Sequence, residues 1–219
     1  MIVIESKRKK PATIYKKYPN AILADVTSST PNDGLRKLSP FYPHGGIPVP
    51  FSDGYTATCV EAIWQGLKVF EGCDIDVSLF KNDTMKGLKR TVRRFGKPLG
   101  HRKGVHGTEL LSYIEARKQI YIPIYRWVLE NKVANIIDKL REASKSGKTI
   151  VLLDYDTNSD VENAKKPLSH ASLIKAYVEG LYPYGDKTES KSKNKRKKEN
   201  IIQLDLFNNI EEEDYGKEK

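Results

Sequence analysis

The composition of the chain changes after Tyr184, and this change limits which residues can form a folded core. Residues 185–200 contain seven Lys or Arg, three acidic residues and no large apolar residue. Such a segment buries too little apolar surface to offset the entropy of ordering its backbone. The sequence therefore predicts a globular domain over residues 1–184, a disordered basic linker over 185–200 and a terminal segment over 201–219.

The net charge of +10 and the pI near 9.4 favour an acidic partner, such as nucleic acid or a phosphorylated ligand. Cys59 and Cys73 lack the spacing of a metal site or a disulfide scaffold, which favours a reducing compartment. The four histidines show no ligand spacing, so no metal and no cofactor is expected. No apolar run approaches the roughly 18 residues of a membrane span, so we expect a cytoplasmic protein with no membrane partner.

Apolar periodicity and turn residues predict a mainly helical α+β domain with a few short strands. Residues 27–55 are rich in proline and glycine and predict a long irregular stretch, a type of segment that often carries function. Strands are expected at 1–5, 21–26 and 149–153, and helices at 12–18, 60–72, 84–95, 109–143 with a kink near Tyr121 caused by Pro123, and 167–179.

Glu61 and the acidic residues that follow the predicted strand 149–153 are candidates for catalysis, but each also has an ordinary structural interpretation. Thr58-x-x-Glu61 has the spacing of a capping box, in which the two side chains bond each other's backbone N–H groups. Asp154 and Asp156, near Asn158, follow a predicted buried strand, and catalytic groups often lie at strand ends. The same residue types also form turns through their own side-chain hydrogen bonds.

Residues 86–103 form the densest basic stretch, with eight Lys or Arg and no acid. On the predicted helix these cations occupy the sides that the apolar stripe leaves free. A solvated surface is the ordinary explanation, but a solvated helix usually mixes charges of both signs. Contact with phosphate groups of a ligand or of nucleic acid is an equally weighted alternative. The candidate residues are Lys86, Lys89, Arg90, Arg93, Arg94, Arg102 and Lys103.

The strings LSPFYP (38–43) and CVEAIWQGLKVF (59–70) resemble the opening of the NADAR superfamily, an S-N-F-x-P-like loop followed by an s-x-E-h-x-x-Q-x-x-K helix. Glu61, Gln65 and Lys68 stand at the matching positions. Later stretches are also similar to that family, so that the resemblance covers residues 27–184. The acidic block after the last predicted strand differs from the family's usual D-x-x-W-G pattern.

The resemblance implies a mostly helical fold and hydrolysis of N-glycosidic bonds in ADP-ribose-linked or modified-nucleobase substrates. It implies that Glu61 is catalytic, with Asp154 or Asp156 as the partner carboxylate. Trp64 lies on the apolar face of its helix, so a place in the core is its alternative. The expected substrate contacts are Phe41, Tyr42, Trp64, Gln65, Lys68 and Asn158.

The pentapeptide QLDLF (203–207) resembles the motif by which bacterial and phage DNA-processing proteins bind the β sliding clamp. The resemblance implies that Gln203, Leu204, Leu206 and Phe207 contact the clamp. Packing of this segment back onto the domain is the alternative. The expected partners are therefore the β sliding clamp, DNA and an ADP-ribose-like or nucleoside ligand, in a bacterial or phage-infected cell and near the nucleoid.

Two other functions stay open on the sequence. One is a non-enzymatic protein that binds DNA and the clamp, and the other is an enzyme that modifies or exchanges DNA bases. The position of Glu61 discriminates between binding and catalysis. A Glu61 buried in a helix cap, with no cleft that joins it to Asp154 or Asp156, would favour the binding protein.

Overall fold

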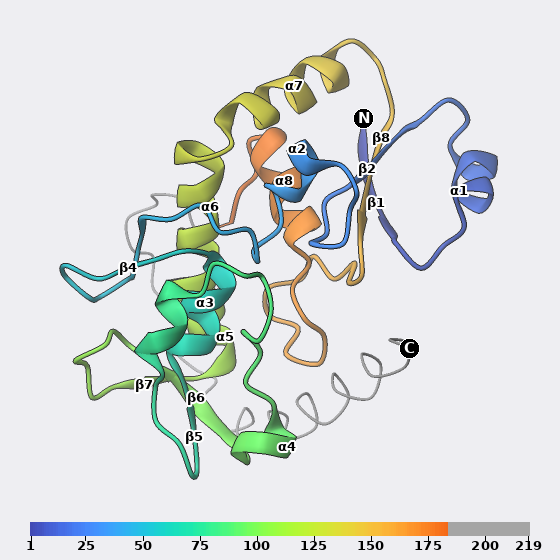
Figure 1. The fold of residues 1–219 in the computed structure, drawn as a ribbon. Helices are drawn as coiled ribbons and strands as arrows, with labels where there is room; N and C mark the ends of the chain where they lie inside the picture. The colour runs from blue at the N-terminus through green and yellow to red at the C-terminus, as the bar shows by residue number, and fades with distance from the viewer. Residues whose placement is uncertain (184–219) are drawn as a thin grey trace, which may run out of the picture.

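Three apolar runs that are far apart in the sequence form one parallel sheet at one end of the protein (Figure 1). The computed structural model describes residues 1–183. The strands are β1 (Ile2–Ser6), β8 (Ile150–Asp154) and β2 (Ile22–Asp25), in that spatial order, with β8 in the centre. Both outer strands run parallel to β8. The three predicted strands are thus confirmed.

Helices cover both faces of this sheet (Figure 1). Ile150, Val151 and Leu152 of β8 have no exposed surface, as expected for a central parallel strand. On one face α1 (Pro11–Lys17) packs Ile14 against Val151. On the other face, α8 (His170–Val178) joins the main hydrophobic core with Leu173. The parallel sheet is therefore fixed firmly enough to position the residues that follow its strands.

The short helix α3 (Val60–Gly66) lies inside the domain, and all of its residues are buried. A helix buried on every side carries its polar residues into the interior, where they need partners. The helix ends at Gly66 and not at Gly72 as predicted, because residues 68–70 pair with residues 98–101 in an antiparallel sheet. A side chain at position 66 would lie 2.5 Å from the ring of Phe80. Phe80 belongs to the 3₁₀ helix η1 (Val77–Lys81). The chain after α3 continues into a strand.

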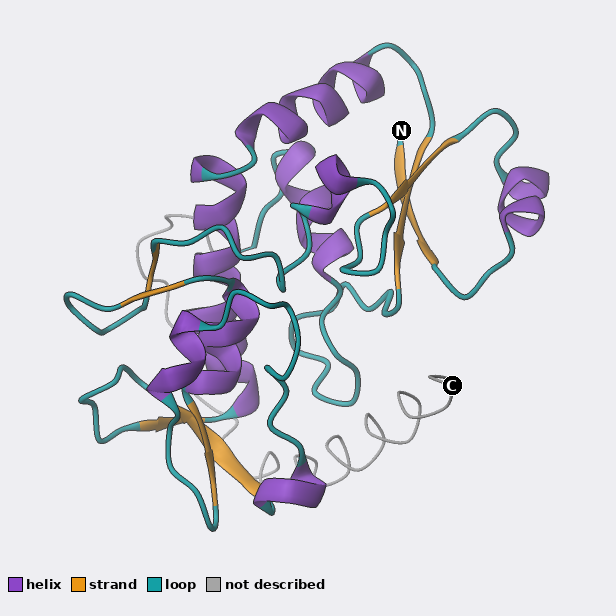
Figure 2. Ribbon diagram, in the orientation of Figure 1, coloured by secondary structure: helices purple, strands orange, loops and turns teal. Residues whose placement is uncertain are grey.

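Two small antiparallel sheets lie at the other end of the protein (Figure 2). The stretch 27–55 is irregular, as predicted. It contains one helical turn, α2 (Asp33–Arg36), and the strand β3 (Ile47–Pro48), which pairs with one other short strand. The remaining elements of this part are β4 (Thr56–Ala57), β5 (Lys68–Phe70), β6 (Pro98–Arg102) and β7 (Leu110–Leu111).

The predicted long helix over residues 109–143 is broken into several pieces. Its first residues form β7, and Ser112 then caps the next helix in a capping box with Glu115. The kink expected from Pro123 is confirmed as a π-helical turn just before it, since proline lacks the N–H of a regular helical bond. A further break at Lys132 and Val133 was not predicted. The pieces are α5 (Tyr113–Ala116), η2 (Arg117–Tyr121), α6 (Ile122–Asn131) and α7 (Ala134–Lys145).

The helix predicted from Thr84 to Phe95 is wrong except for its last turn, α4 (Val92–Phe95). The side chain of Asn82 accepts hydrogen bonds from the backbone and hydroxyl of Thr84, which forms a local turn in place of a helix cap. Met85 and Gly87 then adopt positive φ angles of 61° and 66°. Two such residues within three positions are incompatible with a right-handed helix.

Residues 184–219 lie outside the part of the chain that the structure describes. The predictions for the linker 185–200 and for the terminal segment with QLDLF therefore concern residues outside it. Within residues 1–183, no helix combines the length and the apolar character needed to cross a membrane.

Candidate functional site

Glu61 is a buried carboxylate in the first turn of α3, with 8% of its surface exposed. Gln65, one helical turn later, donates a hydrogen bond from Nε2 to Glu61 Oε1 at 2.8 Å. Lys68 Nζ in turn donates to Gln65 Oε1 at 3.0 Å. The three residues matched by the family pattern thus form one continuous buried network, which holds the Glu61 carboxylate in a defined place.

Glu61 does not form the helix cap that its spacing from Thr58 predicts. The N-cap of α3 is Cys59, whose Sγ accepts from the N–H of Ala62 at 3.3 Å. The Thr58 hydroxyl donates instead to the carbonyl of Asn82 at 2.5 Å. The capping-box interpretation is therefore wrong, and the Glu61 side chain has no capping role that explains its burial.

The irregular segment 38–43 lies directly against the start of α3. The backbone N–H of Glu61 donates to the carbonyl of Pro40 at 2.9 Å, and the Tyr125 hydroxyl fixes the same segment through the carbonyl of Leu38 at 2.6 Å. Phe41 is half-buried against the core, and the ring of Tyr42 lies 4.8 Å from His44. The structure therefore brings the loop and the helix of the family pattern together.

Trp64 packs within a cluster of aromatic rings. The ring of His101 lies over it at a centroid distance of 3.8 Å and an interplanar angle of 32°, while Tyr113 and Tyr121 approach edge-on at 5.8 and 5.6 Å. One face of the indole is thus covered by His101, and 9% of Trp64 is exposed. Trp64 is part of the core around the site, which was the alternative to a substrate contact.

Tyr113 and Tyr121 connect Glu61 with the acidic segment after β8. Burial raises the pKa of Tyr121 well above its ordinary range, and the negative charges of Glu61 and Asp154 raise it further. Burial also raises the pKa of Tyr113, and the negative charges of Asp156 and Glu61 add to this increase. The nearby Arg117 has the opposite effect and lowers this pKa. Both rings pack edge-on against Trp64 of α3, and the Tyr113 hydroxyl accepts from Arg117, which also binds the segment after β8.

Asp154 is held by a buried ion pair. Its Oδ2 lies 3.0 Å from Nδ1 of His170 and accepts from the Ser169 hydroxyl at 2.7 Å, while Oδ1 accepts from the N–H of Tyr155 at 2.7 Å. His170 Nε2 lies 2.9 Å from the carbonyl of Val26, which only accepts, so Nε2 carries a hydrogen. Although burial alone has the opposite effect, the pKa of Asp154 is lowered and that of His170 is raised. We assign Asp154 a structural role.

Asp156 differs from Asp154 in both exposure and environment. It is half-buried, and burial together with the charge of Asp154 raises its pKa, against the opposing charges of Arg8 and Lys89. Arg8 follows β1 and Lys89 belongs to the loop before α4, so Asp156 lies between two distant parts of the sequence. A partly buried carboxyl group with a raised pKa is suited to proton transfer.

The segment that carries Asp156 is fixed by residues that the sequence did not single out. Arg117 is 1% exposed and donates from Nη1 to the carbonyls of Val161 and Asn163, at 3.1 and 2.8 Å. Its Nη2 donates to the Tyr113 hydroxyl at 2.9 Å. Asn158 bonds within the same segment, so it is a turn residue rather than a substrate contact. Arg117 stands between Glu115 and Lys118, so its charged neighbours gave no signal that distinguished it.

Arg90, the centre of the basic stretch, is buried. Its guanidinium donates to the carbonyl of Lys68 at 2.5 Å, the carbonyl of Asp74 at 2.6 Å and Sγ of Cys73 at 3.0 Å. Its backbone N–H donates to Gln65 Oε1 at 3.2 Å. Arg90 therefore supports the Gln65 network from behind, and the prediction that it contacts a phosphate is wrong.

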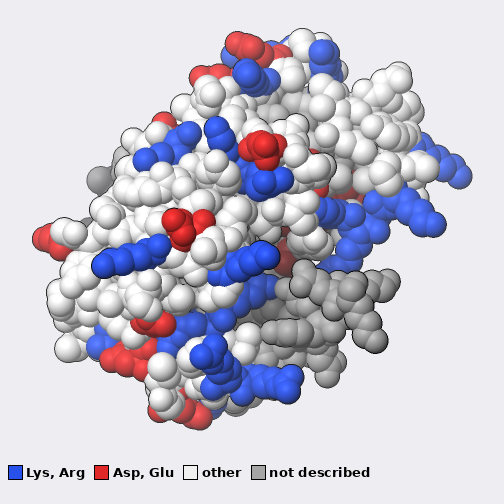
Figure 3. Space-filling model, viewed as in Figure 1, with Lys and Arg blue, Asp and Glu red and all other residues white. Residues whose placement is uncertain are grey.

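The other cations of this stretch lie nearer the surface. Arg102 forms an ion pair with Asp74 at 2.6 Å, and Lys103 forms one with Glu109 at 2.9 Å. The exposed members of the predicted set are Lys86, Lys89, Arg93 and Arg94. In the space-filling view, Lys and Arg side chains gather on the right-hand side and at the lower end of the visible face (Figure 3).

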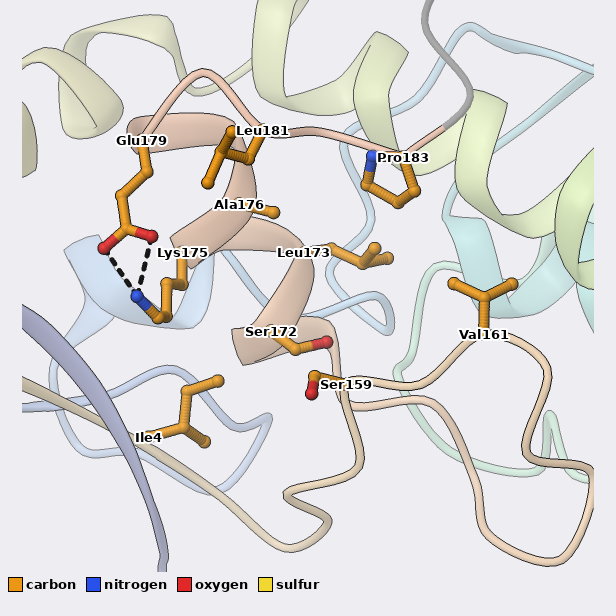
Figure 4. A pocket seen from close by; sticks show the side chains of 10 residues that line it. All are labelled: Ile4, Ser159, Val161, Ser172, Leu173, Lys175, Ala176, Glu179, Leu181 and Pro183. Atoms are coloured by element: carbon orange, nitrogen blue, oxygen red, sulfur yellow. Dashed lines mark hydrogen bonds and ion pairs between the residues drawn. The ribbon is translucent and has the colours of Figure 1, made fainter.

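A separate pocket of about 260 Å³ lies beside α8 (Figure 4). Ser172 and Leu173 of α8, Leu181 and Val161 are among the residues that line it, and an ion pair between Lys175 and Glu179 borders it. Glu61, Asp154 and Asp156 do not line this pocket. We therefore place the candidate site at the carboxylates and not at this pocket.

Among residues 1–183, no group of three or more His, Cys, Asp or Glu side chains is arranged to hold a metal ion. A model of a family of unknown function (DUF6939) matches residues 6–174, and the chain belongs to this family. No curated protein matches the chain.

Proposed function

We propose that this protein hydrolyses the N-glycosidic bond of a substrate that contains ADP-ribose or a modified nucleobase. The observation that carries the proposal is the Glu61 carboxylate, which is buried, is held by Gln65 and has no capping role. Two carboxyl groups with different environments are the usual requirement of glycosidic bond hydrolysis. The resemblance of residues 38–70 to the NADAR pattern supports the same substrate class.

Cleavage of an N-glycosidic bond builds positive charge on the sugar ring. A fixed carboxylate beside the anomeric carbon stabilises this charge more in the transition state than in the ground state. Glu61 fits this role because the hydrogen bond from Gln65 fixes its Oε1 without neutralising its charge. The low solvent exposure of Glu61 and Gln65 strengthens the electrostatic effect, since little water screens it.

Asp156 is the second group of the proposed mechanism. Its raised pKa places it closer to neutral pH than an ordinary aspartate, which suits a group that protonates the leaving base or accepts a proton from the attacking water. Asp154 keeps this segment in place through its bonds to His170 and Ser169. We thus narrow the two candidate partners of Glu61 to Asp156.

Glu61→Gln tests the proposal, because glutamine keeps the size of the side chain and still accepts the hydrogen bond from Gln65. We expect this variant to fold and to release free ADP-ribose from an ADP-ribosylated nucleoside at least about 100-fold more slowly than the wild type. The matched control is Glu109→Gln, which removes a surface carboxylate paired with Lys103 and should keep full activity. A folded Glu61→Gln variant with wild-type activity would refute the catalytic assignment.

We further propose that QLDLF recruits the enzyme to DNA through the β sliding clamp. This segment lies outside the described residues, so the proposal rests on its sequence and on the basic linker before it. The affinity of the peptide alone should be weak, and several sites on one ring would raise its effective concentration. Purified clamp should retain the wild type and an Asn208→Ala control but not Leu206→Ala or Phe207→Ala. Equal retention of all four proteins would contradict recruitment by this motif.

A further inference from the structure

The three strands of the parallel sheet all end at the same edge, and polar residues follow each of them. Lys7 and Arg8 follow β1, Thr27 and Ser29 come shortly after β2, and Tyr155 follows β8. In parallel sheets, ligands bind outside the carboxyl ends of the strands. This edge lies outside the 86–103 stretch that the sequence indicated for phosphate binding.

Lys7 joins the residues at this edge into one cluster. Its Nζ donates to Thr27 Oγ1 at 2.8 Å and to the Ser29 hydroxyl, and forms an ion pair with Asp25 Oδ2 at 2.8 Å. The Ser29 hydroxyl in turn lies 3.0 Å from the hydroxyl of Tyr155. Because the Thr27 hydroxyl donates to Asp25 Oδ1, the Ser29 hydroxyl donates to Thr27 at 3.1 Å, and the Tyr155 hydroxyl therefore donates to Ser29, which fixes the orientation of its ring.

Arg8 adds a second cation at the surface of the cluster. It is exposed, its guanidinium lies 5.7 Å from the centre of the Tyr155 ring, and its Nη1 donates to the Tyr155 carbonyl at 3.4 Å. Tyr155 itself is 43% exposed. An arginine held beside an exposed aromatic ring and hydroxyl groups is a suitable partner for the oxygens of a phosphate group.

The cluster adjoins the candidate site, because Asp156 directly follows Tyr155 in the chain. The charge of Arg8 opposes the increase in the pKa of Asp156, as expected for a guanidinium near that carboxyl group. A ligand at the sheet edge would therefore extend directly toward the second carboxyl group of the proposed mechanism.

We propose that Arg8, positioned at the carboxyl edge of the parallel sheet by Tyr155 and by the cluster around Lys7 and Ser29, binds a phosphate group of the substrate. The inference rests on the proposed function, since it assigns the substrate a phosphate ester close to the bond that is cleaved. The ligand class is a nucleotide sugar such as ADP-ribose, with its diphosphate at the edge and its ribose directed to Asp156 and Glu61. The exposed cations at 86–94 are not needed for this contact.

Equilibrium binding without turnover tests the inference. The probes are ADP-ribose, adenosine as a phosphate-free ligand, and a short single-stranded DNA oligonucleotide. The variants are Arg8→Ala and Tyr155→Phe, and the matched control is Lys16→Ala, which removes an exposed cation from α1. We expect Arg8→Ala to weaken ADP-ribose binding about 10-fold or more and Tyr155→Phe to weaken it by a smaller factor. Adenosine binding should not change in any variant, and Lys16→Ala should match the wild type.

Three outcomes would overturn the inference. These are a wild type that does not bind ADP-ribose, an Arg8→Ala variant with wild-type affinity, and a loss of affinity for the oligonucleotide alone, which would assign Arg8 to a DNA backbone. The result is separable from the test of catalysis. If Glu61→Gln is fully active while Arg8→Ala loses ADP-ribose binding, the phosphate site stands and the catalytic assignment fails. The reverse pattern removes the phosphate site alone.

Discussion

Buried charged residues decide the arrangement of the candidate site. Glu61, Arg90 and Arg117 are each less than a tenth exposed. A buried charge without partners would cost several kcal/mol, so the hydrogen bonds of these residues are a condition of folding. Each arginine donates to several backbone carbonyls and thereby fixes loops, while Glu61 Oε1 accepts one hydrogen bond from the Gln65 amide.

The ion pair of Asp154 and His170 makes stability depend on pH. The pKa of His170 is raised in the folded protein, so its contribution is complete below the ordinary value of 6.5 and is lost as the pH rises through the folded-state pKa. We predict that the free energy of unfolding of the wild type declines above pH 6.5, by at most about 1.4 kcal/mol per pH unit from this group. Urea denaturation between pH 6 and 9 measures this decline.

His170→Gln should remove this part of the pH dependence, while His106→Gln, at an exposed histidine, should keep it. The pKa of Asp154 is lowered in the folded protein, so its contribution disappears only when the pH falls through that folded-state pKa, below 3.8. A wild type and a His170→Gln variant with parallel stability curves from pH 6 to 9 would show that the ion pair is not formed as described.

At the scale of single elements, apolar patterns were reliable where a segment packs regularly. The strands β1, β2 and β8 are short β-branched runs, and the kink at Pro123 follows from the missing N–H of proline. The helix predicted from Thr84 was wrong because the backbone of residues 82–87 adopts a turn, although the apolar residues have helical spacing. Asn82 forms a turn, and Gly87 adopts a positive φ.

The candidate site, too, was only partly predictable from local sequence patterns. The spacing of Glu61, Gln65 and Lys68 was sufficient to predict that they share a region, and the structure joins them in one network. The capping box failed because two neighbouring residues were possible N-caps, and only tertiary contacts decide between Thr58 and Cys59. The cluster at the sheet edge depends on strand order, which local sequence does not determine.

The turn between β6 and β7 tests one of these tertiary contacts. Gly104 has a φ of 85°, and a side chain there would lie 2.1 Å from the carbonyl oxygen of Phe51. The N–H of Val105 also donates to the Ser52 hydroxyl at 2.9 Å. We predict that Gly104→Ala lowers the free energy of unfolding by about 3 kcal/mol, measured by urea denaturation.

Gly147→Ala is the control for backbone strain alone. Gly147 follows the C-cap of α7 and has a φ of 80°, but no atom lies within 4 Å of a side chain built there. Its substitution should cost about 1 kcal/mol, the strain of a left-handed residue without a clash. Equal costs at the two positions would show that the turn is not packed against the segment near Phe51.

At the scale of the whole molecule, the carboxylates come from two different parts of the fold. Glu61 belongs to the helix at the centre of the domain, and Asp156 follows the central strand of the parallel sheet. The proposed site forms where these parts meet, beside Tyr113 and Tyr121. In the proposed function, residues 201–219 bind the sliding clamp and the domain carries out the hydrolysis.

The central claim is that Glu61 and Asp156 act together on one bond. A double-mutant cycle of kcat/KM for hydrolysis of an ADP-ribosylated nucleoside, with Glu61→Gln, Asp156→Asn and the double variant, tests it most directly. We predict that each single change lowers kcat/KM at least about 100-fold. The kcat/KM of the double variant should be within about 10-fold of that of the less active single variant. Wild-type kcat/KM in either folded single variant, or a double variant whose loss equals the product of the two single losses, would contradict the claim.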